Sequence, residues 1–263
     1  MQFLKGLLIT IQFFTAIPIR SELPMDQHHL RKAVQAFPLL GLLQGVFYSL
    51  FLYLLLEFTP FTHLAAAFLL WLAVILFTGG IHLDGWMDAS DAFFSYQGRE
   101  KRLEIMKDPR IGAFGVLSLI ILLSCRFFFI FEFTEIIRLD TYVLITAIPF
   151  FSKSVMGGLL LTVKPAKKEG LGYWFQSSAS PASLWIYPIY LLAFFLLVGY
   201  FFRNQLLPIG ILFTAAAVCF IFCRKKTDAW FGGITGDVIG ASVEGTELIL
   251  WLTVWLLHYF VLA

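Results

Sequence analysis

Residues 62–91 have the sequence THLAAAFLLWLAVILFTGGIHLDGWMDASD, an apolar run that leads directly into a cluster of acidic residues. The apolar part, residues 62–80, approaches the roughly 20 residues that a helix needs to cross the hydrocarbon core of a bilayer. Asp84, Asp88 and Asp91 follow at the spacing i, i+4, i+7, which places three carboxylates on one face of a helix. The stretch therefore predicts a membrane helix with a carboxylate face at its end.

Three like charges on one helix face repel one another, and each is costly to desolvate beside lipid. A divalent cation relieves both costs, and Mg²⁺ prefers oxygen ligands and often shares carboxylates with substrate phosphates. We therefore predict a Mg²⁺ site at these three aspartates. The simpler interpretation is a solvated acidic face at a membrane surface, and a short motif alone does not decide between the two.

The composition is that of an integral membrane protein. Of the 263 residues, 59% are hydrophobic and only 14% are charged, whereas an average soluble domain is about 25% charged. The net charge of +2 is too small to indicate nucleic-acid binding. Cys125, Cys219 and Cys223 lie in apolar runs without a CxxC pair, so neither a zinc site nor a disulfide framework is indicated.

The predicted fold class is all-α, a polytopic membrane helical bundle that forms one domain over residues 1–263. Neither an internal repeat nor a low-complexity linker divides the chain. Residues 1–19 are apolar but end early at Pro18, so they predict an interfacial or re-entrant helix that is retained. About seven spans are predicted, at roughly residues 36–56, 62–80, 112–133, 140–163, 182–202, 206–223 and 243–262.

The basic residues lie mainly on one side of this topology. Most of the 19 lysines and arginines fall in residues 20–35, 81–111, 164–181 and 224–242, which share a side. The positive-inside rule assigns that side to the cytoplasm. We therefore expect a multi-pass protein of the cell (inner, cytoplasmic) membrane, with its active site facing the cytoplasm.

Residues 107–115, KDPRIGAFG, predict a turn that contacts substrate. The proline breaks the helix, and the two glycines allow close backbone approach. Lys107 and Arg110 are placed where they can grip a phosphate, and Asp108 lies between them. The preceding residues 99–107 interleave charged and apolar side chains, which predicts an amphipathic helix at the interface.

Residues 164–172, KPAKKEGLG, predict a basic turn with two glycines. Attraction to anionic lipid explains its lysines about as well as a bound phosphate does. Lys153 lies within a predicted span, where an ionisable residue suggests function, although snorkelling toward the surface is the alternative. Arg126 raises the same question, and the sequence assigns it no partner.

Residues 232–247, GGITGDVIGASVEGTE, combine closely spaced glycines with acidic residues. Gly236 and Gly240 have the small-xxx-small spacing that is also typical of simple helix packing. Packing does not explain Asp237 among the glycines or Glu244 at the mouth of a span. The position of Asp237 is explained if this residue supplies a fourth carboxylate for the cation.

Five blocks of residues occur in a characteristic order: FPLLG at 37–41, GIHLDGWMDASD at 80–91, MKDPRIGAFG at 106–115, GLG at 170–172 and the glycine-rich block at 232–247. In this combination the chain resembles the cobalamin synthase family, the adenosylcobinamide-GDP ribazoletransferases. Leu83 stands where many members have an acidic residue, so it is not counted as a ligand. Lys153 stands where arginine is frequent, which weakens bidentate phosphate recognition there.

The resemblance implies the final joining step of adenosylcobalamin assembly, with Mg²⁺ as the cofactor. The hydroxyl of α-ribazole, or of its 5′-phosphate, attacks the cobinamide-linked phosphate of adenosylcobinamide-GDP, and GMP leaves. The implied partners are these substrates and the lipid bilayer, without nucleic acid, and a homo-oligomer stays open. The site residues are expected to be Asp84, Asp88, Asp91 and His82 for catalysis, Lys107, Asp108, Arg110, Lys153, Thr235 and Glu244 for substrate, and Asp84, Asp88, Asp91 and Asp237 for the metal.

The identity of the general base has two interpretations. His82 or one free carboxylate is placed to take the hydroxyl proton, but a structural histidine at the end of a span is slightly preferred. Two alternative functions also remain. A CDP-alcohol-type phosphotransferase of phospholipid synthesis also uses spaced aspartates, but its Ala-Arg after Asp-Gly is missing after Gly85. A divalent cation transporter is expected to show paired repeats, which this chain does not.

Overall fold

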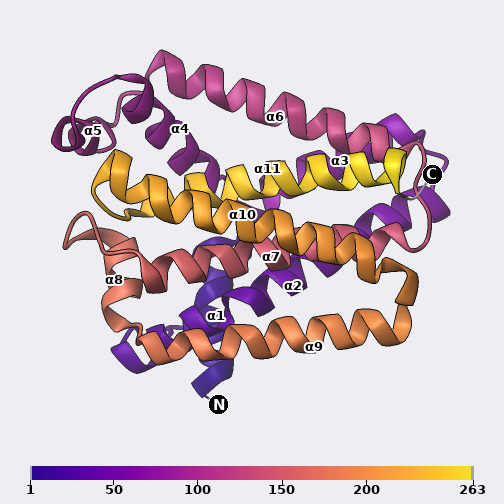
Figure 1. Ribbon diagram of the computed structural model, residues 1–263, viewed down its shortest axis with the longest axis horizontal. Coiled ribbons are helices and arrows are strands. Elements are labelled where there is room, and N and C mark those ends of the chain that lie inside the picture. The colour runs from indigo at the N-terminus through magenta and orange to yellow at the C-terminus, as the bar shows by residue number, and fades with distance from the viewer. Residues whose placement is uncertain (1, 262–263) are drawn as a thin grey trace.

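The computed structural model describes residues 2–261, which form a bundle of long helices (Figure 1). The helices are α1 (Gln2–Phe14), α2 (Gln27–Phe58), α3 (His63–Thr78), α4 (Ile81–Phe94), α5 (Arg99–Ile105), α6 (Ala113–Thr134), α7 (Thr141–Thr162), α8 (Gly170–Ser178), α9 (Ile186–Phe201), α10 (Leu206–Phe231) and α11 (Gly236–Phe260), with short 3-10 helices η1 (Pro181–Trp185) and η2 (Arg203–Gln205). This arrangement confirms the predicted all-α class.

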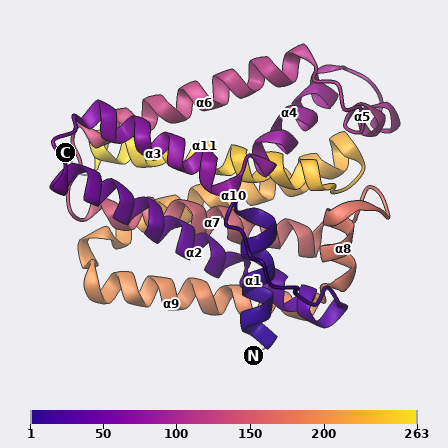
Figure 2. The same cartoon turned by 180° about the vertical axis from the view of Figure 1, so that it is seen from behind.

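Within residues 2–261, six helical segments are long and apolar enough to cross a membrane, and a seventh span is formed if α3 and α4 are taken together. The six are α2, α6, α7, α11, the segment Ala182–Phe201 and the segment Arg203–Phe231. The shorter apolar helix α1 runs crosswise to the long helices and lies over the start of α2 (Figure 2). The predicted polytopic bundle with a short N-terminal helix is therefore confirmed.

Helix α11 occupies the middle of the bundle, between α6 on one side and α10 and α7 on the other (Figure 1). Large side chains of α11 form the core of the bundle, such as Trp251, which is fully buried and stacks on Phe133 of α6. On the other side of the bundle, α2 and α7 cross closely. A β-carbon at Gly41 would lie 2.3 Å from the carbonyl oxygen of Pro149, so only glycine permits this approach.

The break between α3 and α4 is a bend of 85°. Gly79 and Gly80 form it, with φ of 61° and 78°, in the left-handed region that favours glycine. The predicted span 62–80 therefore ends at Thr78, and the acidic stretch begins a new helix that points away from the axis of α3. The apolar run continues through the two glycines, but the helical backbone conformation ends before them.

Three helices extend beyond the predicted spans for a related reason. α2 begins at Gln27 rather than residue 36, α10 continues to Phe231 rather than ending at 223, and α11 begins at Gly236 rather than 243. Helix ends here are set by caps: Gly232, at φ of 74°, ends α10, and the Thr235 hydroxyl caps the start of α11. Hydropathy marks only the apolar part of each helix, so the polar residues at these helix ends lie outside the predicted spans.

Candidate active site

The carboxylate face of α4 meets the N-terminus of α11. A β-carbon at Gly85 would lie 2.7 Å from the carbonyl oxygen of Asp237, and one at Gly240 would lie 3.1 Å from that of His82. The two backbones are therefore in direct contact, and this contact brings Asp237 beside the aspartates of α4. The charges of Asp84, Asp237 and Asp91 all act on Asp88. We call these four residues the carboxylate cluster.

Asp91 joins α4 to the start of α6. Its two carboxylate oxygens accept the backbone N–H groups of Gly112, at 2.9 Å, and Gly115, at 2.8 Å. A β-carbon at either glycine would overlap this carboxylate, with closest approaches of 2.2 and 2.3 Å. The two glycines of the 107–115 turn thus leave room for the Asp91 carboxylate and donate hydrogen bonds to it. Because these donors lie at the N-terminus of α6, the helix dipole also favours the negative charge of Asp91.

Two loops that are distant in sequence close the other side of the site. Pro165 and Ile234 form an isolated parallel bridge, with Ala166 N–H donating to Ile234 O and Ile234 N–H donating to Lys164 O, both at 2.9 Å. Lys167 Nζ donates to the carbonyl of Leu103 at 2.7 Å, which ties this loop to α5. The three sequence segments singled out for chemistry are therefore in contact.

Helix N-termini converge on the carboxylate cluster. The start of α8 packs against the start of α11, where a β-carbon at Gly172 would lie 3.0 Å from the backbone nitrogen of Gly236. The N-terminus of α6 is the one held by Asp91. Unsatisfied N–H groups and the helix dipole make such ends favourable for anions. Lys167 adds a positive charge that acts on Asp237.

The predicted phosphate-gripping residues lie on the exposed rim of the site. Lys107 forms an ion pair with Glu169, the residue that precedes α8. Arg110 pairs with Asp108, with Nη2 donating to Oδ2 at 2.5 Å, and this guanidinium lowers the pKa of Asp108 to about 2. Exposed pairs of this kind are weak because water screens their charges, so an incoming phosphate can exchange for either carboxylate.

His82 lies in the protein interior. Its side chain is buried, its ring stacks on Phe14 at a centroid separation of 5.7 Å, and within residues 2–261 its Nε2 has no hydrogen-bond partner. This environment favours the structural interpretation of His82 over the role of general base. Its catalytic role stays a prediction.

Lys153 and Glu244 take part in buried ion pairs deeper in the bundle. Lys153, with no exposed surface, pairs with Glu247 at 3.4 Å, and Arg126 pairs with Glu244 at 2.5 Å. Arg126 is 1% exposed. The sequence assigned this arginine no partner, and the structure identifies Glu244 as its partner. These contacts connect α7 and α6 to α11. They favour a structural role for Lys153 and Glu244, whose contact with substrate stays a prediction.

Thr235, also predicted to bind substrate, is the N-cap of α11. Its Oγ1 accepts the N–H of Val238 at 3.2 Å and lies 3.5 Å from Oδ2 of Asp237. The threonine thus fixes the first turn of α11, where Asp237 is located. A direct contact with substrate stays a prediction.

The prediction of a Mg²⁺ site is supported by the kind of oxygen donors that the carboxylate cluster offers. In the part of the chain that the structure describes, no three His, Cys, Asp or Glu side chains are grouped so that together they could hold a metal ion. Mg²⁺ usually takes only one or two protein carboxylates and completes its shell with water and substrate phosphates. Exposed Asp84 and half-buried Asp88 and Asp237 supply oxygen donors of that kind.

Sequence reasoning missed three residues that the structure places in or behind this site. Glu169 pairs with Lys107, Lys167 acts on Asp237, and Glu247 pairs with Lys153. The first two lie in the basic turn that was already singled out, so charge within that turn was a usable signal. Glu247 lies three residues after Glu244 within a span, so a second intramembrane acid was itself a signal, although the sequence does not identify Lys153 as its partner.

Fold and site together define a polytopic membrane protein with an acidic site ringed by helix N-termini. A sequence model of the family described as Cobalamin-5-phosphate synthase matches residues 6–255. The chain belongs to this family.

Curated relatives agree over nearly the whole length. Proteins named adenosylcobinamide-GDP ribazoletransferase are 41% identical in a Geobacillus species, covering 98% of both chains, and 40% identical in Geobacillus kaustophilus, with the same coverage. The protein of that name from Treponema denticola is 37% identical, covering 93% of this chain and 95% of its own. No solved structure matches this chain.

Proposed function

We propose that this protein transfers the adenosylcobinamide-phosphate group of adenosylcobinamide-GDP to the hydroxyl of α-ribazole, or of α-ribazole 5′-phosphate, and releases GMP. The observation that carries the proposal is the contact between the carboxylate cluster and the N-termini of α8 and α11, in a chain of this family. The name of the relatives describes the same reaction. Neither a CDP-alcohol phosphotransferase nor a cation transporter has comparable support.

The reaction exchanges one phosphoester bond for another. The ribazole hydroxyl oxygen forms a bond to the phosphorus attached to cobinamide, and the bond from that phosphorus to the bridging oxygen breaks. The electron pair stays on the bridging oxygen, which leaves with GMP, and the hydroxyl proton passes to a base. Negative charge grows on the phosphate oxygens and the leaving group, so catalysis depends mainly on positioning and charge neutralisation.

The residues around the cluster can supply both. Backbone N–H groups at the starts of α8 and α11 favour the pyrophosphate, and Lys107, Arg110 and Lys167 supply side-chain positive charge. Asp84 is exposed whereas His82 is buried, so we propose a carboxylate of the cluster as the acceptor of the hydroxyl proton.

We propose Mg²⁺ as the cofactor, held by one or two of the carboxylates of Asp84, Asp88 and Asp237, with water and substrate phosphates completing its shell. When bound, the ion supplies positive charge to the phosphate oxygens and leaving group. Support comes from four mutually repelling carboxylates whose charge the described side chains only partly balance, through Lys167. Asp91 already accepts two N–H groups, so we assign it mainly to holding α4 against α6.

We also propose that this end of the bundle faces the cytoplasm in the cell membrane. Figure 1 shows α5, α8 and the turn between α10 and α11 gathered at the same end as α4. The basic run of Arg224, Lys225 and Lys226 lies near this end of α10 and is exposed. Positive charge at one end of membrane helices favours the cytoplasmic side, where nucleotide substrates occur.

The test is GMP release by the purified protein in lipid nanodiscs. We expect GMP from adenosylcobinamide-GDP only when α-ribazole or its 5′-phosphate is also present, in equal amount to the cobalamin product. Release that is independent of ribazole would indicate a hydrolase and contradict the transferase. Absence of release with both ribazoles, from folded protein and over a range of Mg²⁺ concentrations, would contradict the proposed function.

A further inference from the structure

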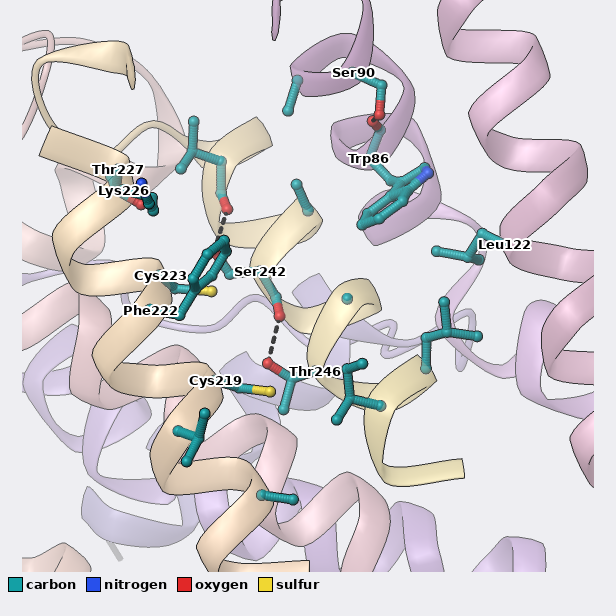
Figure 3. A pocket seen from close by; sticks show the side chains of 18 of the residues that line it. Trp86, Ser90, Leu122, Cys219, Phe222, Cys223, Lys226, Thr227, Ser242 and Thr246 are labelled. Carbon is teal, nitrogen blue, oxygen red and sulfur yellow. Dashed lines mark hydrogen bonds between the residues drawn. The ribbon is translucent and has the colours of Figure 1, made fainter. Parts of the chain in front are cut away.

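A large groove runs along the bundle on the far side of α4 from the carboxylate cluster. Its volume is about 1390 Å³, above the roughly 300–1,000 Å³ that is usual for small-molecule pockets. Figure 3 shows Trp86 of α4 and Leu122 of α6 on one side, and Phe222 and Cys223 of α10 on the other. The carboxylates occupy the helix face opposite to Trp86, so the groove is separate from the proposed active site.

The walls of the groove offer hydrocarbon rather than polar groups. The indole N–H of Trp86 has no hydrogen-bond partner within residues 2–261. Six of the seven hydroxyls that line the groove, all except that of Thr227, donate to carbonyls of their own helices at 2.6–2.8 Å: Ser90, Ser118, Thr214, Ser242, Thr246 and Thr253. Their hydrogen bonds are therefore already made, two of them visible in Figure 3. Such a surface suits an apolar chain and does not suit a nucleotide.

The groove also has the length of a membrane. On α10 its lining extends from Leu206 to Phe231, which corresponds to about 38 Å of helix and is enough to cross the hydrocarbon core of about 30 Å. The side chains along this length lie between α6 and α10, both of which are predominantly apolar spans. An occupant is therefore expected to lie parallel to the helices, as lipid chains do.

One end of the groove carries a positive charge. Lys226 lines it, with Nζ 5.5 Å from the centre of the Trp230 ring, and across residues 2–261 no carboxylate forms an ion pair with this lysine. Arg224 and Lys225 precede it on the same exposed turn. An unpaired lysine where an apolar groove reaches the end of a membrane helix matches the phosphate of a lipid.

We propose that the groove binds an anionic phospholipid, with an acyl chain between α6 and α10 and its phosphate at Lys226. The chain packs against Trp86 and Ala89, on the face of α4 that is opposite to the carboxylates. The lipid therefore forms part of the support of α4. The proposal concerns binding alone and does not depend on the reaction that the protein catalyses.

Native mass spectrometry of the delipidated protein, given equal phosphatidylglycerol and phosphatidylcholine, tests the headgroup contact. We expect wild type to retain phosphatidylglycerol preferentially. Lys226→Gln is expected to lower that preference about fivefold, the effect of one basic residue near a membrane surface. The neighbouring exposed Lys225, which does not line the groove, supplies the matched control, and Lys225→Gln is expected to keep the preference.

A second pair of variants tests the chain contact. Val218 lines the groove and is 60% exposed, whereas Ile221 is 51% exposed on the same helix outside it. Val218→Trp is expected to lower retention of both lipids, and Ile221→Trp to leave it unchanged. Equal lipid retention by Val218→Trp and wild type, or an unchanged headgroup preference in Lys226→Gln, would overturn the proposal. The proposal would also be overturned if the wild-type protein were a dimer and Val218→Trp dissociated it without changing lipid retention. That result would show that a second copy of the protein, and not a lipid, fills the groove.

Discussion

Gly85 of α4 and Asp237 of α11 are in backbone contact, so closely that a β-carbon at position 85 would lie 2.7 Å from the Asp237 carbonyl oxygen. This contact, rather than any ion pair, brings the fourth carboxylate to the three on α4. Two glycines make the approach, since Gly240 meets the backbone of His82 in the same crossing. The position of the acidic site therefore depends on the absence of a β-carbon at Gly85 and Gly240.

The first prediction concerns this crossing. Gly85→Ala must push α4 and α11 apart, because the new methyl group meets backbone atoms that cannot turn away. We expect a loss of about 1–3 kcal/mol in the free energy of unfolding, typical of overpacking, and at least a tenfold drop in GMP release. Gly98→Ala is the control, since nothing lies within 4 Å of its added carbon. Equal activity of the two variants would show that the crossing does not position the site.

The second prediction separates two roles among the aspartates. Asp91→Asn weakens the contacts to Gly112 and Gly115, and we expect a loss of about 1.5–3 kcal/mol, the usual worth of a hydrogen bond to a charged group. Asp84, which is exposed, is expected to contribute little to folding. Thermal unfolding in detergent should therefore show a lower transition for Asp91→Asn than for Asp84→Asn. The reverse order would contradict the anchoring role of Asp91.

The third prediction concerns the buried pair of Arg126 and Glu244. Removing one partner leaves an uncompensated buried charge, so Arg126→Met is expected to cost about 3–5 kcal/mol of unfolding free energy. The double variant Arg126→Met, Glu244→Gln removes both charges and should recover much of that loss. Chemical unfolding of the detergent-solubilised proteins measures both. An exposed pair serves as reference, because Lys101→Met, which breaks the contact to Glu104, is expected to change the unfolding free energy far less than Arg126→Met.

The fourth prediction follows from the pKa of Asp108. Arg110 holds this carboxyl in its charged form, with a pKa of about 2 rather than the ordinary 3.8. The lowered pKa means that the pair stabilises the fold above pH 3.8 and that this contribution disappears as pH falls through about 2. In Arg110→Gln we expect the pKa to rise toward 3.8, because the guanidinium is lost while the backbone N–H of residue 110 still donates to the carboxyl. NMR titration of ¹³C-labelled aspartate in nanodiscs measures this change. Lys101→Gln should leave the pKa unchanged, and an unshifted pKa in Arg110→Gln would show that another group holds the charge.

The sequence predicted those parts of the fold and site that depend on local patterns. Hydropathy located the spans, and the spacing of Asp84, Asp88 and Asp91 placed three acids on one helix face, as α4 confirms. Glycine-rich blocks correctly indicated close backbone approach. Caps decided the helix ends, which is why the helices near Gly232 and Thr235 extend beyond the predicted spans.

Contacts between distant residues were beyond the reach of sequence patterns. Arg126 and Glu244 are 118 residues apart, and Lys153 and Glu247 are 94 apart. A charge within a span suggests function until its partner is known, and the packing of α6 and α7 on α11 supplies those partners only in three dimensions. The same is true of Asp91, whose two N–H donors lie in another helix.

We propose that Asp84, Asp88 and Asp237 of the carboxylate cluster form the Mg²⁺ site of a ribazole transferase. The most direct test of this proposal is the initial rate of GMP release as a function of Mg²⁺ concentration, for wild type, Asp84→Asn, Asp88→Asn and the exposed control Glu57→Gln in α2. We predict a rate that depends on Mg²⁺ in wild type and Glu57→Gln, and a loss of at least a hundredfold in both aspartate variants, partly restored by higher Mg²⁺. Near-normal turnover in Asp84→Asn or Asp88→Asn would contradict the account.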